Sequence, residues 1–285
     1  EELVSHEANM TPQEYMDMVR KAKSHILAGD IFQVVLSQRL SIPFTLPPFD
    51  FYRELRRINP SPYLFFLNFG DFAIAGSSPE ILVQLTGDKI TIRPIAGTRP
   101  RGATPEDDER LEKELLADEK ERAEHLMLLD LGRNDVGRSA EIGTVEVNRI
   151  FYVERYSHVM HIVSNVEGKI RAGFSAVKAL MNGFPAGTVS GAPKIRAIQI
   201  IDDLEPDSRG IYAGSIGYFA GNGDMDTCIA LRTALIKDGR LYVQAGAGIV
   251  HDSVPENEHA ECLAKARALL VAAKSAQDRA RAQEN

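Results

Sequence analysis

Hydrophobic residues recur along this chain with two different spacings. Stretches where they return every three or four positions predict helices, at residues 12–28, 49–58, 104–131, 176–181, 195–204 and 256–273. Stretches where they alternate or run together between turn residues predict strands, at residues 31–40, 63–69, 73–76, 81–92, 145–155, 158–166, 212–219, 228–237 and 241–246. Many strands follow one another through short connections. The pattern therefore predicts an α+β fold with large, mostly antiparallel β-sheets flanked by helices.

Local signals mark where some of these elements begin and end. Thr11-Pro12-Gln13-Glu14 is a capping box with proline at the first helical position, and Gly29 is the expected end of that helix. Thr86-Gly87-Asp88 predicts a hairpin turn between two strands. No repeat or flexible linker divides the chain. We expect an N-terminal extension at residues 1–10, one catalytic domain at 11–273 and a polar, frayed tail at 274–285.

The charge balance excludes one large class of partners. The 285 residues include 33 basic and 40 acidic side chains, for a net charge of −7, so we expect no nucleic acid bound through phosphate contacts. We find no signal-like apolar stretch and none long enough for a membrane span, and therefore expect no membrane partner. The two cysteines, Cys228 and Cys262, indicate a reducing compartment, and we expect a cytoplasmic protein. The first residue is Glu rather than Met, so we expect a piece of a longer protein.

The segment from Phe184 to Lys194 reads F-P-A-G-T-V-S-G-A-P-K and lies between two predicted helices. Glycine lets a backbone approach a ligand closely, and proline fixes the path of the chain. Ala192-Pro193 opens the next helix, whose free N–H groups favour an anion. The composition predicts an anion-binding loop, and a tight interhelical turn is the alternative.

Two pairs of carboxylates lie one turn apart on predicted helices, Glu121 with Glu124 and Glu258 with Glu261. Like charges at this spacing destabilise a helix unless something compensates them. A hard divalent cation does so, and oxygen ligands alone suit Mg²⁺. Each pair taken alone is also compatible with an ordinary solvated helix face.

Two further side chains are candidates for chemistry. Arg232 lies in a predicted strand, where alternation places it on the face of Ala230 and Ala234, two small residues that leave room for a ligand. A structural salt bridge explains it equally well. His161 lies in an apolar strand, where a histidine with its hydrogen bonds satisfied in the core is the common case.

The loop at 184–194, the stretch K-E-R-A-E-H-L-M-L-L-D-L-G-R-N-D at 120–135 and the stretch P-E-N-E-H-A-E at 255–261 together resemble the chorismate-using enzymes, and among them the anthranilate synthases. The segment Y-S-H-V-M-H-I-V-S at 156–164 carries the same resemblance. It extends from about Thr11 to Ala273, nearly the whole chain. It implies a chorismate-binding fold and a Mg²⁺-dependent reaction in the tryptophan pathway.

The resemblance also implies a role for each matching residue. Glu124 and Glu261 would bind Mg²⁺ directly, with Glu121 and Glu258 in support. Glu80 would be the general acid that protonates the departing ring hydroxyl, which requires a pKa raised by burial. The remaining positions match substrate contacts and an active-site histidine: Thr188, Tyr212, Arg232, Gly246, Ala247, Gly248 and His161.

Two positions separate the reactions within this family. Ala96 stands where related aminodeoxychorismate synthases have a nucleophilic lysine, and Gln33 stands where isochorismate synthases have a lysine that activates water. The resemblance therefore implies that ammonia attacks from outside: it adds at C2 of chorismate, the C4 hydroxyl leaves, and elimination of pyruvate gives anthranilate. The chain shows no amidase signature of its own, so we expect ammonia from a glutamine amidotransferase subunit.

Family members also carry a feedback site for tryptophan. Pro62 and Tyr63, in Asn59-Pro60-Ser61-Pro62-Tyr63, resemble part of that site, and the rest belongs to an N-terminal region that precedes this segment in the family. Three alternatives remain: another chorismate enzyme, an inert fragment that keeps only binding surfaces, and a di-iron protein suggested by Glu256-x-x-His259. The many predicted strands argue against the last, which needs a four-helix bundle.

Overall fold

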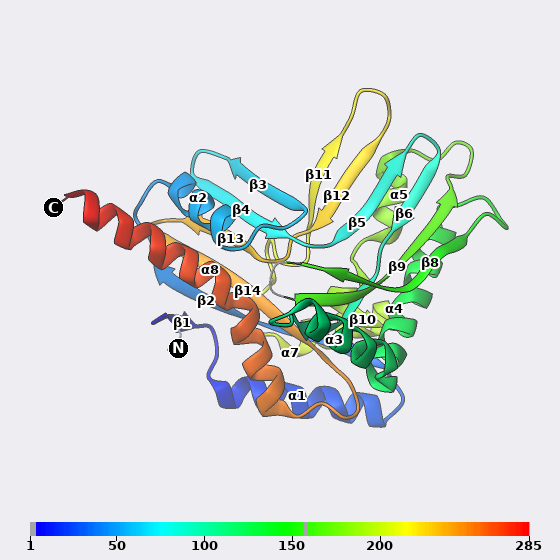
Figure 1. Cartoon of the computed structure of the whole chain (residues 1–285), viewed down its shortest axis with the longest axis horizontal. Coiled ribbons are helices and arrows are strands. Elements are labelled where there is room, and N and C mark those ends of the chain that lie inside the picture. Colours follow the sequence, from blue (N-terminus) through cyan, green and yellow to red (C-terminus); the bar gives the residue numbers. More distant parts are fainter. Residues whose placement is uncertain (1–3, 157–158, 285) are drawn as a thin grey trace. The chain divides into compact units, whose positions relative to one another are not determined.

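A computed structural model describes residues 4–156 and 159–284 of the chain (Figure 1). The described residues form two seven-stranded sheets whose paired strands are antiparallel, so the predicted α+β class is confirmed. The chain divides into two compact units. Unit 1 comprises Glu1–Pro79, Val189–Gly214 and Ala230–Asn285, and unit 2 comprises Glu80–Thr188 and Ser215–Ile229. The prediction of one catalytic domain over residues 11–273 stays a prediction.

Unit 1 is built on a sheet with the strand order β1-β2-β14-β13-β4-β3, and β10 also pairs with β2. The strands are β1 (Glu7–Ala8), β2 (Gln33–Pro43), β3 (Tyr63–Asn68), β4 (Phe72–Ser78), β10 (Gly191–Ala192), β13 (Thr233–Lys237) and β14 (Arg240–Ile249). The helices are α1 (Pro12–Leu27), α2 (Pro48–Ile58), α7 (Lys194–Leu204) and α8 (Pro255–Glu284). Figure 1 shows α8 running beside β2 and β14, and it packs on β14, α1 and α2.

Alternation along β2 explains the core of unit 1. Val34, Leu36, Leu40 and Ile42 share one face of the strand and are almost fully buried against apolar side chains of the helices. At the start of α1 the predicted capping box is present: Glu14 N–H donates to Thr11, and the Glu14 carboxylate accepts from Thr11 N–H. These agreements arise because each signal acts within a few residues of chain.

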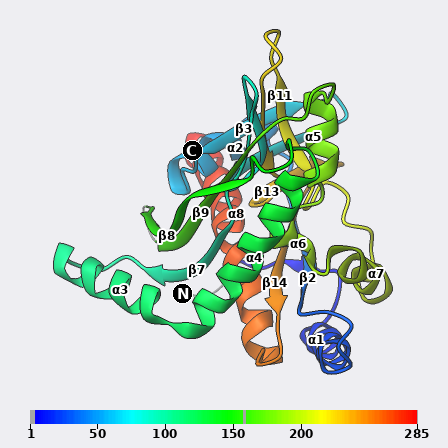
Figure 2. The same ribbon diagram turned by 90° about the vertical axis from the view of Figure 1, so that its right-hand side faces the viewer.

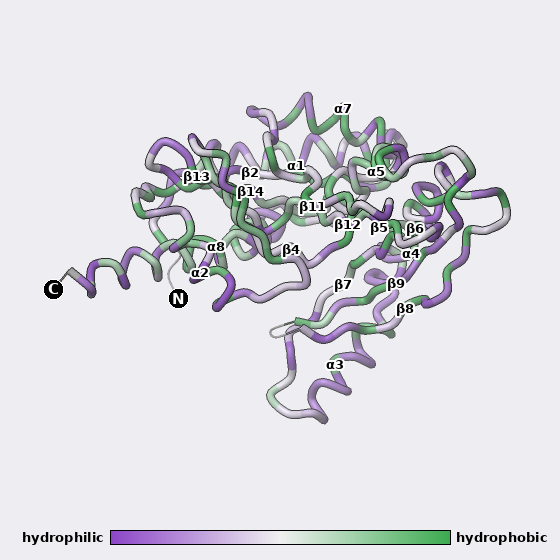
Figure 3. Tube along the Cα trace, turned by 90° about the horizontal axis from the view of Figure 1, so that it is seen from above, coloured by the Kyte–Doolittle hydropathy of each residue, from purple (hydrophilic) through white to green (hydrophobic). Residues whose placement is uncertain are grey.

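Unit 2 has the strand order β11-β12-β5-β6-β9-β7, and β8 also pairs with β9. The strands are β5 (Ile81–Thr86), β6 (Lys89–Ile92), β7 (Ile95–Pro100), β8 (Glu146–Arg155), β9 (Val159–Lys169), β11 (Ser215–Phe219) and β12 (Met225–Ile229). The helices are α3 (Pro105–Ala117), α4 (Glu119–Gly137) and α5 (Ala176–Gly183), and the four-residue α6 (Gly187–Ser190) contains the boundary between the units. Figure 2 shows α4 beside β7 and β9, on which it packs. In Figure 3, α3 is coloured largely as hydrophilic.

Several element boundaries differ from the sequence-based expectation. The helix expected at 104–131 is two helices, because the Asp118 side chain accepts N–H bonds from Lys120 and Glu121 and starts α4 anew. The helix expected to end at Ala273 continues to Glu284, with Ala276 buried and Lys274 paired to Asp278 at 2.7 Å.

Strands were also missed or misplaced by the sequence pattern. β7 was not predicted, and the strand expected at 228–237 is interrupted between β12 and β13. Residues 1–3, 157–158 and 285, which include the expected first residue of the strand at 158–166, lie outside the described part. No helix in the described part of the chain is both long and apolar enough to cross a lipid bilayer.

Candidate active site

In unit 1 the structure brings Tyr212 and Gly246 together. Tyr212 is buried, and its hydroxyl oxygen lies 2.8 Å from the position that a Cβ atom on Gly246 would occupy. Only glycine leaves room for the tyrosine hydroxyl at this point of β14. Burial also raises the pKa of Tyr212, so its hydroxyl stays protonated and can donate a hydrogen bond.

Lys265 on α8 joins two of the candidate residues of unit 1. Its Nζ atom donates to the carbonyl oxygen of Gly246 at 2.9 Å and lies 2.7 Å from Oε1 of Glu261. Lys265 is not among the residues predicted from the sequence, although it lies one turn after Glu261 on a predicted helix. The side chain therefore links a candidate metal ligand to the backbone of a candidate substrate site.

The expected strand environment of Arg232 is wrong. Arg232 lies between β12 and β13 with a φ of 46°, and its carbonyl oxygen accepts a bond from Ser77 N–H at 3.0 Å. Positive φ interrupts the alternation on which the prediction rested, so Arg232 does not share a strand face with Ala230 and Ala234. Its role as an anchor for a carboxylate stays a prediction.

The other unit 1 candidates occupy less informative positions. Ala247 packs its side chain in the core, so only its backbone could meet a ligand, and Gly248 follows it in β14. Glu258 lies in the first turn of α8 and is partly exposed. Pro62 is exposed, and Tyr63 begins β3 opposite Ser78.

In unit 2 the structure brings Glu80 and Thr188 together at one small cavity. The space is about 30 Å³, which is enough for a water molecule, and its lining includes these two residues, Asp135 and Gly187. Glu80 and Asp135 are both buried. The Oγ1 atom of Thr188 is buried and has no hydrogen-bond partner among the described residues. Sequence reasoning missed Asp135, although it closes the R-N-D end of the recognised stretch.

The glycines of the 184–194 loop have a structural explanation. A Cβ atom on Gly187 would lie 1.9 Å from a methyl carbon of Leu131 on α4, and one on Gly191 would lie 2.2 Å from the carbonyl oxygen of Gln33 on β2. Both glycines therefore permit close packing against the protein's own chain. Helix α7 does begin directly after Pro193, as predicted.

His161 lies in β9 as predicted and is buried. Its Nδ1 atom is 3.0 Å from the Thr98 hydroxyl and 3.1 Å from the carbonyl oxygen of Gly97, both on the neighbouring strand β7. The ring of Tyr156 meets its ring edge-on at 5.6 Å. These contacts fix the orientation of the imidazole ring within unit 2.

The carboxylate pair on α4 lies near the same strand. Glu121 accepts a bond from Arg99 of β7 at 3.0 Å, and Arg99 also binds Asp118 at 2.7 Å. Glu124, one turn along α4, is partly buried. Arg99 was not singled out from the sequence, because nothing in the primary pattern connects it to a helix 22 residues away.

The oxygen donors of the four glutamates suit Mg²⁺ chemically. Each unit, however, contributes only one pair, and among the described residues no group of three or more His, Cys, Asp or Glu side chains is gathered closely enough to hold a metal ion. Each pair on its own therefore fits as a partial ligand set.

A second histidine adjoins the α4 pair and was also missed. His125 is fully buried, with Nε2 2.7 Å from the Ser164 hydroxyl of β9. Burial lowers its pKa to about 4, so the ring is neutral near pH 7. Its contact with β9 fastens α4 to the sheet directly beside Glu124.

The two positions that separate reactions in this family are well defined. Gln33 is buried at the start of β2 opposite Ala192, and Ala96 lies in β7 opposite Ile162. Neither carries an amino group that could act as a nucleophile or a base.

The chain belongs to the family of chorismate binding enzymes, whose model matches residues 1–271. It is 63% identical over 269 residues to anthranilate synthase component 1 of Cereibacter sphaeroides. The aligned region makes up 94% of this chain and 54% of that protein. It is 58% identical over 265 residues to the protein of the same name from Pseudomonas putida, covering 93% and 54%. The chain thus spans about half the length of the curated relatives it matches.

Solved structures give the same picture. The anthranilate synthase component I of Streptococcus pneumoniae matches with a TM-score of 0.88 and 48% identity, over 94% of this chain and 60% of that one. The menaquinone-specific isochorismate synthase MenF of Escherichia coli matches with a TM-score of 0.85 and 28% identity, over 94% and 63%. The two solved structures therefore match the fold of this chain almost equally well, whereas the isochorismate synthase has the lower sequence identity.

Proposed function

We propose that this chain is the chorismate-binding portion of an anthranilate synthase component I. The proposal depends chiefly on Gln33 and Ala96. With these two residues, this member of the chorismate binding family has neither the lysine that would attack the ring nor the lysine that would activate water. The nucleophile is then ammonia, supplied by a glutamine amidotransferase subunit. The names and the 54–63% identity of the curated relatives support the same assignment.

The residues of the chain have separate tasks in this reaction. Arg232 and Tyr212 bind the enolpyruvyl carboxylate, and the backbone amides of Gly246, Ala247 and Gly248 bind a second carboxylate of chorismate. Ammonia forms a bond to C2 while the C4 hydroxyl leaves with a proton from Glu80, so amination releases one water. Loss of pyruvate from the aminated intermediate then gives anthranilate, with His161 nearby.

The glutamates Glu121, Glu124, Glu258 and Glu261 would hold Mg²⁺. When bound, the metal supplies positive charge that orients and neutralises a carboxylate of chorismate. The protein's own part is to hold these carboxylates in place, and Arg99 and Lys265 pair with Glu121 and Glu261 respectively. Tryptophan as feedback inhibitor, acting partly through Pro62 and Tyr63, belongs to the same proposal.

The test is formation of fluorescent anthranilate from chorismate, ammonium and Mg²⁺ by this chain. Arg232→Ala removes a charge-assisted hydrogen bond and should weaken chorismate binding roughly ten- to a hundredfold. Arg240→Ala is the matched control, because the Arg240 guanidinium donates to Glu7 and Ser41, neither of which is a candidate site residue. Formation of isochorismate, or no turnover and no chorismate binding, contradicts the proposal.

A further inference from the structure

The ion pair between Glu205 and Arg209 in unit 1 is largely enclosed by the protein. The side chain of Glu205 is 4% exposed and that of Arg209 is 16% exposed. Arg209 donates from Nε to Oε2 at 2.9 Å and from Nη2 to Oε1 at 2.6 Å, which is the paired geometry that only arginine provides. Such a pair is costly to bury, so its position calls for an explanation beyond stability.

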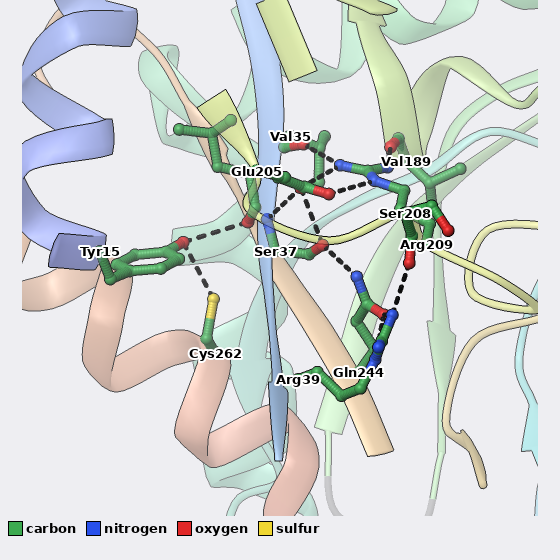
Figure 4. Close-up of polar contacts among 11 residues, drawn as sticks. Tyr15, Val35, Ser37, Arg39, Val189, Glu205, Ser208, Arg209, Gln244 and Cys262 are labelled. Carbon is green, nitrogen blue, oxygen red and sulfur yellow. Dashed lines mark hydrogen bonds and ion pairs between the residues drawn. The ribbon is translucent and has the colours of Figure 1, made fainter. Parts of the chain in front are cut away.

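The pair occupies an incomplete edge of β2. On this side of the strand β10 pairs with residues 33–34 and β1 with residues 40–41, and none of the described strands pairs with the residues between them. Arg209 Nη2 donates to the carbonyl oxygen of Val35 at 2.6 Å, and Ser37 N–H donates to Glu205 at 2.7 Å. The two side chains thus take the place of a strand and satisfy buried backbone groups (Figure 4).

The same guanidinium reaches the segments that carry two candidate substrate contacts. Arg209 Nη1 donates to the carbonyl oxygen of Val189 at 2.7 Å, and Val189 directly follows Thr188. The guanidinium carbon lies 5.3 Å from the centre of the Tyr212 ring, within the range of a cation–π contact. Tyr212 N–H also donates to the carbonyl oxygen of Arg209 at 3.1 Å, so the two residues share one turn.

A second layer of hydrogen bonds holds the pair in place. The Ser37 hydroxyl donates to Glu205 at 2.8 Å and accepts from Gln244 at 2.8 Å, and Arg39 donates to the Gln244 side chain at 3.3 Å (Figure 4). Gln244 lies on β14 two residues before Gly246. The network therefore spans β2, β14 and the turn that carries Tyr212.

We propose that Glu205 and Arg209 are positioning residues that hold the Tyr212 ring against Gly246 and fix the chain after Thr188 for substrate binding. This inference deepens the proposed function and rests on it for the identity of the substrate. The Tyr212 ring lies near the Arg209 guanidinium, and the Tyr212 hydroxyl lies against Gly246. A small displacement of Arg209 should therefore move the hydroxyl away from Gly246.

The test compares Arg209→Lys with Glu205→Gln in the whole chain. Lysine keeps the charge but loses the paired geometry, and glutamine can still accept from Ser37. Both variants should raise the KM for chorismate about tenfold and change kcat less than about threefold. Combining Arg209→Lys with Tyr212→Phe should raise the KM by less than the product of the two separate effects, because both changes act on the placement of the Tyr212 hydroxyl.

A matched control separates positioning from stability. Glu54 on α2 is also 4% exposed, and its side-chain partners among the described residues, Arg57, Arg279 and Ser275, are not candidate site residues. Glu54→Gln should lower the melting temperature much as Glu205→Gln does and leave the KM unchanged. An equal rise of KM in Glu54→Gln, or an unchanged KM in both pair variants, overturns the inference.

A readout that needs no turnover keeps this inference distinct from the proposed function. In protein labelled with 3-fluorotyrosine, Tyr212→Phe identifies the fluorine resonance of Tyr212. That resonance should shift in Arg209→Lys and Glu205→Gln and stay in place in Glu54→Gln. A shift in a protein that does not turn over chorismate would keep the positioning role and refute the proposed function. An unmoved resonance refutes the positioning role.

Discussion

The two carboxylate pairs have the same sequence spacing but different surroundings. On α4, Glu121 is paired with Arg99, which comes from strand β7, and the two side chains are 25% and 18% exposed. On α8, Glu261 is paired with Lys265 of the same helix, and the two side chains are 48% and 46% exposed. One counter-ion is supplied by the tertiary fold, and the other by the next helical turn.

The difference concerns how freely each carboxylate can exchange its partner. A half-exposed pair one turn apart on a helix contributes little and is easily broken, whereas a mostly covered pair between two elements is fixed by the packing around it. Glu121 therefore keeps one orientation, and Glu261 can leave Lys265 when another cation arrives. The α8 pair is the adjustable half of the proposed metal site.

The strongest test replaces a ligand in each pair. Glu124→Gln and Glu261→Gln should each abolish Mg²⁺-dependent turnover, because an amide is a poor ligand and removes a charge from the site. The measurements are initial rates against Mg²⁺ concentration and calorimetry with Mg²⁺ alone. Glu256→Gln, which changes an exposed side chain of α8, should behave like the unchanged protein. Full activity in either ligand variant would remove the metal assignment.

Features coded within a few residues were predictable from the sequence. The capping box at Thr11, the hairpin at Gly87 and the spacing of the carboxylate pairs each depend on local chain geometry. The fold class followed from the same local patterns, since many short strands in succession leave few alternatives to antiparallel sheets.

Features that depend on distant contacts were not predictable. Arg99 meets Glu121 only because β7 packs beside α4, and Asp135 meets the Glu80 cavity only in the folded unit 2. Arg232 left its expected strand because its backbone takes a positive φ, which no apolar pattern reveals. The sequence motif locates candidate residues along the chain, whereas the tertiary structure determines which charged residues pair with them.

The histidines beside the two pairs extend the comparison to pH. Burial lowers the pKa of His125 to about 4 and also lowers that of the less buried His259. Below about pH 6.5 the unfolded chain binds a proton at His125 that the folded chain does not, so stability is present above that pH and is lost toward pH 4. The loss amounts to about 3 kcal/mol over this range.

Urea unfolding without added metal at pH 7, 6 and 5 measures this effect. His125→Gln should remove most of the slope, since glutamine can still bond to Ser164 and does not titrate. His259→Gln should change the slope less, because His259 is only partly buried against Tyr15. Equal slopes for His125→Gln and the unchanged protein would show that α4 is not fastened through a neutral histidine.

The smallest expected effect separates the two counter-ions themselves. Arg99→Met leaves Glu121 and Asp118 partly buried without a cation and should lower the free energy of unfolding by about 2 kcal/mol. Lys265→Met should lower it by less than about 1 kcal/mol, because its pair with Glu261 is half exposed. Lys265→Met should also lower the Mg²⁺ concentration needed for half-maximal binding, since Glu261 no longer has a competing cation. Denaturant unfolding and calorimetry with Mg²⁺ measure both quantities. If the two variants lose the same stability, or if Lys265→Met needs more Mg²⁺, then Lys265 is a fixed part of the fold as Arg99 is, and the α8 pair is not the adjustable one.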